Sequence, residues 1–195
     1  NGGAENYDFS GKDGVRIYTG KGDDTVVGSE GIDVIIGGEG SDTLDGNAGN
    51  DVLEGGQGDD TLIGSDTQNV YLYAWGDGND TIIDAGSEDN APDTVRFTNL
   101  DISRVSIERV DDDMVIHIHD ELGSKLDAFG KAFGSVTVKD GYSEGMIEHF
   151  YFKDERYDFH EVLAKAVSDT DYYFVKGDGH ITIEDIGGED TLHFG

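Results

Sequence analysis

Aspartate recurs every nine residues between Thr19 and Ile63, and a carboxylate in each repeat could bind a metal ion. Each aspartate follows a glycine by two positions and precedes a branched apolar residue by two. The aspartates are Asp24, Asp33, Asp42, Asp51 and Asp60, the glycines Gly22, Gly31, Gly40, Gly49 and Gly58, and the apolar residues Val26, Ile35, Leu44, Leu53 and Leu62. A fixed period of nine indicates a solenoid of stacked turns that share ligands, because no ordinary helix or sandwich repeats in this way.

The two halves of each unit predict a tight turn followed by a short strand. Glycine in the first half permits positive φ angles and a loop whose carbonyl groups turn inward. The second half, for example residues 60–64, suits a strand of three or four residues with its apolar side chain on one face. Two units then complete one coil. The sequence therefore predicts an all-β fold, a parallel β-roll with a thin apolar interior.

Stacking of such coils would align the aspartates in two columns. One column holds Asp24, Asp42 and Asp60, and the other holds Asp33 and Asp51. Two carboxylates about 5 Å apart repel by roughly 3 kcal/mol at an effective dielectric near 20. Residues 20–64 contain eleven acidic residues and one lysine, so a divalent cation has to relieve the repulsion. Calcium accepts mixed carboxylate and carbonyl ligands in irregular geometry and fits better than magnesium. Aspartates that only solvated turns would not need to keep a nine-residue register.

The repeat resembles the RTX family of secreted bacterial proteins, whose units follow the pattern GGxGxDxUx, with U apolar. The resemblance implies that one loop binds calcium through its second and fourth carbonyl groups and its aspartate. The loop eighteen residues later would add its first and third carbonyl groups and its own aspartate. The implied sites are Gly20, Gly22 and Asp24 with Gly37, Glu39 and Asp42; Ser29, Gly31 and Asp33 with Gly46, Ala48 and Asp51; and Gly38, Gly40 and Asp42 with Gly55, Gln57 and Asp60.

The pattern weakens on both sides of the five units. Residues 10–18 carry Val15 at the aspartate position, which suggests a degenerate cap. Residues 64–72 form a weak sixth unit, with Asn69 at the aspartate position and Tyr71 at the apolar one.

A motif that often closes an RTX roll follows after a two-residue slip. Residues 75–83 read WGDGNDTII, and the resemblance implies that Asp80, with less support Asp77, is a further calcium ligand. Residues 71–97 are also echoed by residues 172–194, where Ile181 replaces the ligand aspartate. The chain is therefore expected to be a piece of a much longer protein that contains tandem motifs.

Residues 98–168 follow a different pattern. Alternating residues predict a hairpin over 105–118 and strands over 135–139 and 146–152, and i, i+3, i+4 spacing predicts a short helix over 158–167. The order resembles the haemolysin-type calcium-binding related region that follows RTX rolls, and its expected role is to cap the roll. The predicted division is an N-terminal cap at 1–18, a β-roll at 19–97, a β-rich flanking segment at 98–168 with the helix at 158–167, and a second roll-type motif at 169–195.

Composition narrows the classes of partner. The formal net charge of −30 excludes nucleic acid and disfavours an anionic membrane surface. With only 35% apolar residues, so much self-repulsion indicates that the roll stays unfolded without bound cations. The absence of cysteine fits an exported bacterial protein stabilised by metal, and no apolar run is long enough to span a membrane.

Other chemistry has weaker support. His117 and His119 lie two apart on an expected strand, a spacing that zinc can use, but ordinary half-exposed strand histidines explain them more simply. Tyr71, Tyr73 and Trp75 could form a sugar platform, although such residues more often cover the apolar end of a roll. The sequence contains no nucleophile elbow, zinc-protease helix or phosphate loop, so we expect no enzyme.

Three functions remain open. The first is a calcium-binding module that folds outside the bacterial cell, as part of a larger toxin or adhesin. The RTX resemblance implies export by type I secretion machinery for such a protein. The second is a module that binds a glycan or another extracellular surface ligand. The third is the non-catalytic C-terminal region of a secreted protease, lipase or epimerase.

Overall fold

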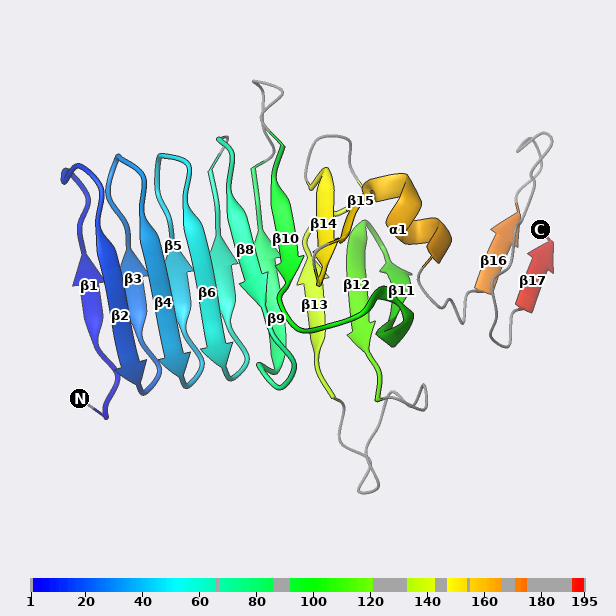
Figure 1. Cartoon of the computed structure of the whole chain (residues 1–195), viewed down its shortest axis with the longest axis horizontal. Helices are drawn as coiled ribbons and strands as arrows, with labels where there is room; N and C mark the ends of the chain where they lie inside the picture. The colour runs from blue at the N-terminus through cyan, green and yellow to red at the C-terminus, as the bar shows by residue number, and fades with distance from the viewer. Residues whose placement is uncertain are drawn as a thin grey trace.

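The computed structural model describes residues 2–65, 67–85, 92–120, 133–142, 147–153, 155–165, 171–174 and 191–194. Two large sheets dominate it, one of eight strands in the order β1-β3-β5-β7-β9-β13-β12-β11 and one of seven in the order β15-β14-β10-β8-β6-β4-β2. Strands β1 to β10 lie side by side along the long axis of the molecule, in two layers (Figure 1). All strand pairs among these ten are parallel. The predicted parallel β-roll is therefore confirmed.

Successive strands alternate between the two sheets. One sheet receives β1 (Asn6–Asp8), β3 (Thr25–Val27), β5 (Thr43–Asp45), β7 (Thr61–Ile63) and β9 (Asn79–Ile83). The other receives β2 (Arg16–Lys21), β4 (Val34–Glu39), β6 (Val52–Gln57), β8 (Val70–Tyr73) and β10 (Thr94–Phe97). Strands β3, β5 and β7 have the predicted length of three residues. Strands β4 and β6 have six, because each continues through the paired glycines of the next unit.

The apolar position of every unit points into the space between the sheets. Val26 pairs with Leu44, Leu44 with Leu62, and Leu62 with Ile82 along one sheet. Ile35 pairs with Leu53 and Leu53 with Tyr71 along the other. All of them are at most 2% exposed, so each contributes about 1.5–3 kcal/mol of apolar burial. The coil from Leu62 to Ile82 contains the two extra residues that precede residue 75, and the two side chains still pair in the same register as the earlier coils.

The flanking segment continues both sheets. Strands β11 (Val105–Val110) and β12 (Asp113–Ile118) form the predicted antiparallel hairpin. Strand β13 (Ser135–Val138) pairs in parallel with β9, and β14 (His149–Phe152) pairs in parallel with β10. The predicted domain boundary at residue 97 stays a prediction. Both sheets continue past this residue without a break.

Two further elements complete this end of the molecule. Strand β15 (Glu155–Asp158), which the sequence did not predict, pairs antiparallel with β14. The predicted helix is present as α1 (Phe159–Lys165), and a 3₁₀ turn, η1 (Ile102–Arg104), precedes β11. Phe97 stacks on Phe152 with ring centroids 4.6 Å apart, so aromatic side chains fill the interior where the roll meets these strands.

The second roll-type motif is described only through its two strands, β16 (Asp171–Phe174) and β17 (Thr191–Phe194). They pair in parallel, in the register that β8 and β10 use at the corresponding positions of the first copy. Ile181 and residues 121–132 lie outside the described residues. Within the described part, no helix is long and apolar enough to cross a membrane.

Candidate metal centre

The first aspartate column lies where the chain turns from β2, β4, β6 or β8 into the opposite sheet. The backbone N–H of Asp24 donates to Asp42 Oδ1 at 2.7 Å, and that of Asp42 donates to Asp60 Oδ1 at 2.7 Å. The N–H of Asp60 in turn donates to Asp80 Oδ1 at 3.2 Å. All four carboxylates are at most 2% exposed. The structure thus brings together the three aspartates of this column and extends it to Asp80.

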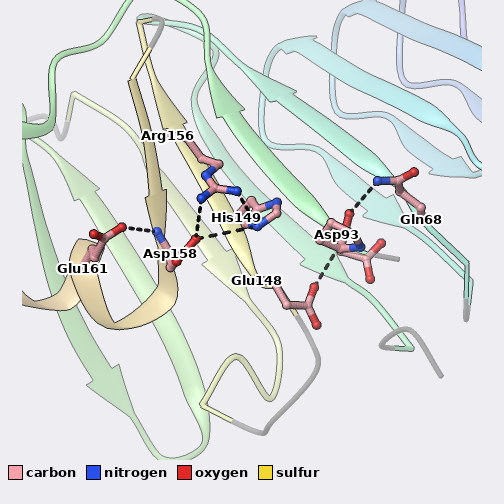
Figure 2. Close-up of polar contacts among 8 residues, drawn as sticks. Gln68, Asp93, Glu148, His149, Arg156, Asp158 and Glu161 are labelled. Atoms are coloured by element: carbon pink, nitrogen blue, oxygen red, sulfur yellow. Dashed lines mark hydrogen bonds and ion pairs between the residues drawn. The ribbon is translucent and has the colours of Figure 1, made fainter. Parts of the chain in front are cut away.

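The second column follows the same rule along the other edge of the roll. The N–H of Asp33 donates to Asp51 Oδ1 at 2.9 Å, and that of Asp51 donates to Asn69 Oδ1 at 3.2 Å. The column then continues beyond the repeats. The N–H of Asn69 donates to Asp93 Oδ1 at 2.6 Å. The N–H of Asp93 donates in turn to Glu148 Oε2 at 2.8 Å (Figure 2).

Sequence reasoning missed Asp93 and Glu148 as members of this column. One signal was present, because Asp93, Thr94 and Val95 repeat the aspartate-threonine-apolar order of the regular units. The spacing from Asn69 to Asp93 is 24 residues, so a search for multiples of nine passes over it.

Each column carboxylate uses one oxygen for the hydrogen bond to the preceding coil. The second oxygen is buried without a hydrogen-bond partner in six of them: Asp24, Asp42, Asp51, Asp60, Asp80 and Asp93. Such orphaned oxygens are costly in a protein interior unless a cation binds them. At Asp33, by contrast, the backbone N–H of Ser29 donates to Oδ2 at 2.5 Å.

Glycine at the first position of a unit leaves room for oxygen atoms from two coils to converge. A Cβ atom added at Gly28 would lie 2.5 Å from both Asp33 Oδ2 and the Gly46 carbonyl oxygen. A Cβ at Gly37 would likewise meet the Asp42 carboxylate and the Gly55 carbonyl oxygen. These oxygen pairs belong to the second and third predicted sites, and their hard, anionic character fits calcium.

The remaining predicted ligands are backbone carbonyl groups of the same stacked turns. The carbonyl oxygens of Glu39 and Gln57 accept from Gly22 and Gly40 N–H groups at 2.7 Å, and that of Gly37 accepts from the Thr19 hydroxyl at 2.8 Å. A carbonyl oxygen has two lone pairs, so one such bond leaves it able to bind an ion. The other residues whose carbonyl groups are predicted calcium ligands are Gly20, Gly22, Ser29, Gly31, Gly38, Gly40 and Ala48.

Burial controls the electrostatics of the columns. It raises the pKa of Asp51 to about 6, of Asp60 to about 7 and of Asp80 and Asp93 to about 8, and it raises the pKa of Asp42 as well. Repulsion from the carboxylate of the neighbouring coil adds to the effect, for example from Asp60 on Asp80. Without a cation, the folded columns therefore disfavour their own ionised form.

Asp77 lies outside the column that contains Asp80. Its Oδ2 accepts from the Ala74 N–H at 2.6 Å, and its carbonyl oxygen accepts from the Gly58 N–H at 2.5 Å. The carbonyl thus occupies the place that Glu39 and Gln57 have in earlier coils, whereas the carboxylate closes its own turn.

The two histidines do not converge on one site. His117 Nε2 lies 2.7 Å from Glu108 Oε2, and His119 Nε2 lies 2.7 Å from Ser106 Oγ. No group of three His, Cys, Asp or Glu side chains in the described ranges is arranged to hold a metal. A calcium site in the aspartate columns would rely on carbonyl groups for its other ligands.

The aromatic residues serve mainly as packing. Tyr71 and Tyr73 are at most 2% exposed in the core. Trp75 borders a cavity of about 470 Å³, but the Arg104 guanidinium lies 3.9 Å from its ring centroid and Phe133 stacks on it at 5.3 Å. The indole is therefore already engaged by two protein side chains.

Comparison with protein families matches the RTX calcium-binding nonapeptide repeat in four overlapping copies, at residues 11–35, 18–53, 27–62 and 36–70. Comparison with curated proteins gives no match. Repeats of this kind bind Ca²⁺ and form structural modules, and the matched residues hold five of the column aspartates. Residues 11–70 of this chain are thus a calcium-binding repeat region of the RTX family, folded as a parallel β-roll.

Proposed function

We propose that this chain is a calcium-dependent folding module of a larger secreted bacterial protein, a toxin or an adhesin. The observation that carries the proposal is the set of six buried carboxylate oxygens that have no hydrogen-bond partner. At Gly37 the orphaned oxygen of Asp42 lies beside the Gly55 carbonyl oxygen of the next coil, and the whole chain carries a formal net charge of −30. Calcium bound between the coils would supply the missing positive charge.

The concentration of calcium would then decide where the chain folds. Calcium is scarce in the cytosol, so the unneutralised columns would keep the chain unfolded and able to pass through a type I secretion channel. Outside the cell, calcium near millimolar concentration would fill sites with affinities on the order of 10⁻⁴–10⁻³ M. Each filled site adds RT ln(1 + [Ca]/Kd), and several sites together reach a few kcal/mol.

A calcium titration followed by circular dichroism tests the proposal. We expect little β-structure in excess chelator and a cooperative gain of β-structure as free calcium rises toward the millimolar range. Magnesium at the same concentration is the control, and it should produce a much smaller gain because it demands a tighter octahedral site. Full β-structure in chelator, unchanged on addition of calcium, would contradict the proposal.

A ligand-binding role for the aromatic residues has less support. The face of Trp75 that a sugar would need is covered by Arg104, and Tyr71 and Tyr73 are buried. Glycan binding that is lost on Trp75→Ala, while calcium-dependent folding is kept, would favour that role instead.

A further inference from the structure

Asn69 occupies a column position that aspartate holds in the adjacent coils, and both polar atoms of its carboxamide are hydrogen-bonded. Its Oδ1 accepts from the Asp51 N–H at 3.2 Å, as an aspartate Oδ1 does elsewhere in the column. Its Nδ2 donates to the carbonyl oxygens of Ser65 at 3.2 Å and Thr67 at 2.9 Å. A flipped amide would set N–H against N–H and oxygen against two carbonyl oxygens, so the network fixes this orientation.

The two carbonyl groups that Asn69 binds are those that the repeat would offer to an ion. Ser65 and Thr67 are the second and fourth residues of the unit at 64–72, and the ligand assignment for the regular units uses these two positions. The Thr67 hydroxyl also donates to the Gly49 carbonyl oxygen at 2.5 Å, which is the fourth-position carbonyl of the preceding coil. Asn69 Nδ2 therefore lies within hydrogen-bond distance of both the Ser65 and the Thr67 carbonyl oxygens, where an ion shared by these two oxygens would have to bind.

The contrast with the neighbours in the column is direct. Asp51 and Asp93 each have a buried Oδ2 without a partner, whereas Asn69 is fully buried and both polar atoms of its side chain are paired. A Cβ added at Gly64 would meet the Tyr71 hydroxyl, Asn69 Nδ2 at 2.8 Å and Asp84 Oδ2 at 2.9 Å, whereas the side-chain oxygen met at Gly28 belongs to the column aspartate of the same unit, Asp33. At the column position itself, a nitrogen that donates two hydrogen bonds thus replaces the second carboxylate oxygen of the regular units.

We propose that the carboxamide of Asn69 takes the place of a calcium ion beside the Ser65 and Thr67 carbonyl groups, which interrupts the second column between Asp51 and Asp93. The proposal rests on the proposed function, because it uses the same assignment of ligands. The amide supplies two partial positive charges to the carbonyl groups and adds no negative charge. In the folded roll, this turn therefore needs no calcium ion of its own.

The same geometry predicts the effect of a carboxylate at position 69. Asp93 lies one coil further on, is fully buried and has a free Oδ2. A second carboxylate at position 69 would release the Ser65 and Thr67 carbonyl groups and complete a pair of the kind found in the first column. Asn69→Asp is therefore expected to create one calcium site.

Counting bound calcium in the whole chain by equilibrium dialysis tests this inference. We expect Asn69→Asp to bind one more ion per chain than the wild type. The control is Asn50→Asp, which adds the same charge at an exposed position of a regular unit and should leave the count unchanged. The double variant Asn69→Asp with Asp93→Asn should lose the gain. An unchanged count in a folded Asn69→Asp variant would overturn the inference.

A second variant covers the case in which Asn69→Asp does not fold. Asn69→Ala removes all three hydrogen bonds of the side chain, so we expect the same calcium count and a lower melting temperature in saturating calcium. Loss of an ion in this variant would mean that Asn69 is itself a ligand, and would overturn the inference. If the wild type bound no calcium at all, the proposed function would fail; a normal count with no gain would refute only the role of Asn69.

Discussion

Asp42 is bonded on both sides within its column, since its N–H donates to Asp60 and its Oδ1 accepts from the Asp24 N–H. Its second oxygen is orphaned, and the ligand assignment that the RTX resemblance implies uses this carboxylate in two predicted sites. Asp42→Asn keeps the size of the side chain but removes the charge. We expect the calcium concentration for half-maximal folding to rise about tenfold, equivalent to roughly 1.4 kcal/mol. Circular dichroism at several calcium concentrations measures this shift.

The matched control is Glu30→Gln, which removes one negative charge from an exposed side chain on the same roll. Its half-maximal calcium concentration should stay close to that of the wild type. If Asp42→Asn and Glu30→Gln shift the titration equally, general charge rather than ligation explains the effect.

The sequence was sufficient to predict Asp42 as a column residue, but not the column residues that lie outside the repeats, Asp93 and Glu148. The nine-residue period predicts the two columns because every regular coil has the same length. Asp93 and Glu148 join the second column after 24 and 55 further residues, and only the strand pairing of β8, β10 and β14 aligns them. The bonds that satisfy Asp33 and Asn69 within their own turns also depend on local backbone geometry that the residue pattern does not encode.

At the scale of the turn, glycine is required by close approach between coils. Gly58 has φ of 143°, and a Cβ there would clash with the Gly40 carbonyl oxygen of the preceding coil. Gly58→Ala should therefore destabilise the calcium-bound fold by more than about 2 kcal/mol, beyond the roughly 1 kcal/mol typical of a strained glycine position. Urea unfolding in saturating calcium gives the free energy.

Gly76 provides the comparison. Its φ is 95°, but a Cβ at this glycine would have no atom within 4 Å, so Gly76→Ala carries backbone strain without a clash. We expect a clearly smaller loss of stability than for Gly58→Ala. Equal losses would show that the tight stacking of the turns adds nothing to the conformational requirement.

The elements were predictable where residue patterns repeat or alternate. The hairpin of β11 and β12 follows from alternating apolar residues around an acidic turn, and it is present as expected. Strand β15 was missed because only Tyr157 of its four residues is buried, which leaves no alternation to recognise. The role of the flanking segment as a cap stays a prediction; what the residue pattern did not predict is that β13 and β14 extend the two sheets by pairing with β9 and β10.

At the scale of the molecule, metal-free folding should depend on pH. The pKa of Asp60 is raised to about 7 and that of Asp80 to about 8 by burial, against an ordinary value of 3.8. The folded state therefore binds more protons than the unfolded state between these values. The stability from this source is fully present below about pH 4 and is lost as the pH rises through 7 to 8. In excess chelator, β-structure measured by circular dichroism should increase as the pH falls from 8 to 5.

Saturating calcium provides the control for this experiment, because the ion removes the reason for the carboxylates to bind protons. The gain of β-structure on acidification should then disappear. A metal-free chain whose circular dichroism is the same at pH 8 and pH 5 would contradict the electrostatic account of the columns.

The alternation of consecutive units between two sheets makes the roll sensitive to parity. Removal of two units, such as residues 28–45, would shorten the stack by one coil, about 4.8 Å, and return every later strand to its own sheet. Removal of a single unit would transfer every later strand to the opposite sheet. Strands β13 and β14 would then meet the wrong partners, although each nonapeptide remained intact. Removal of whole nonapeptides from the regular units therefore preserves the strand pairing only in steps of eighteen residues, twice the period seen in the sequence.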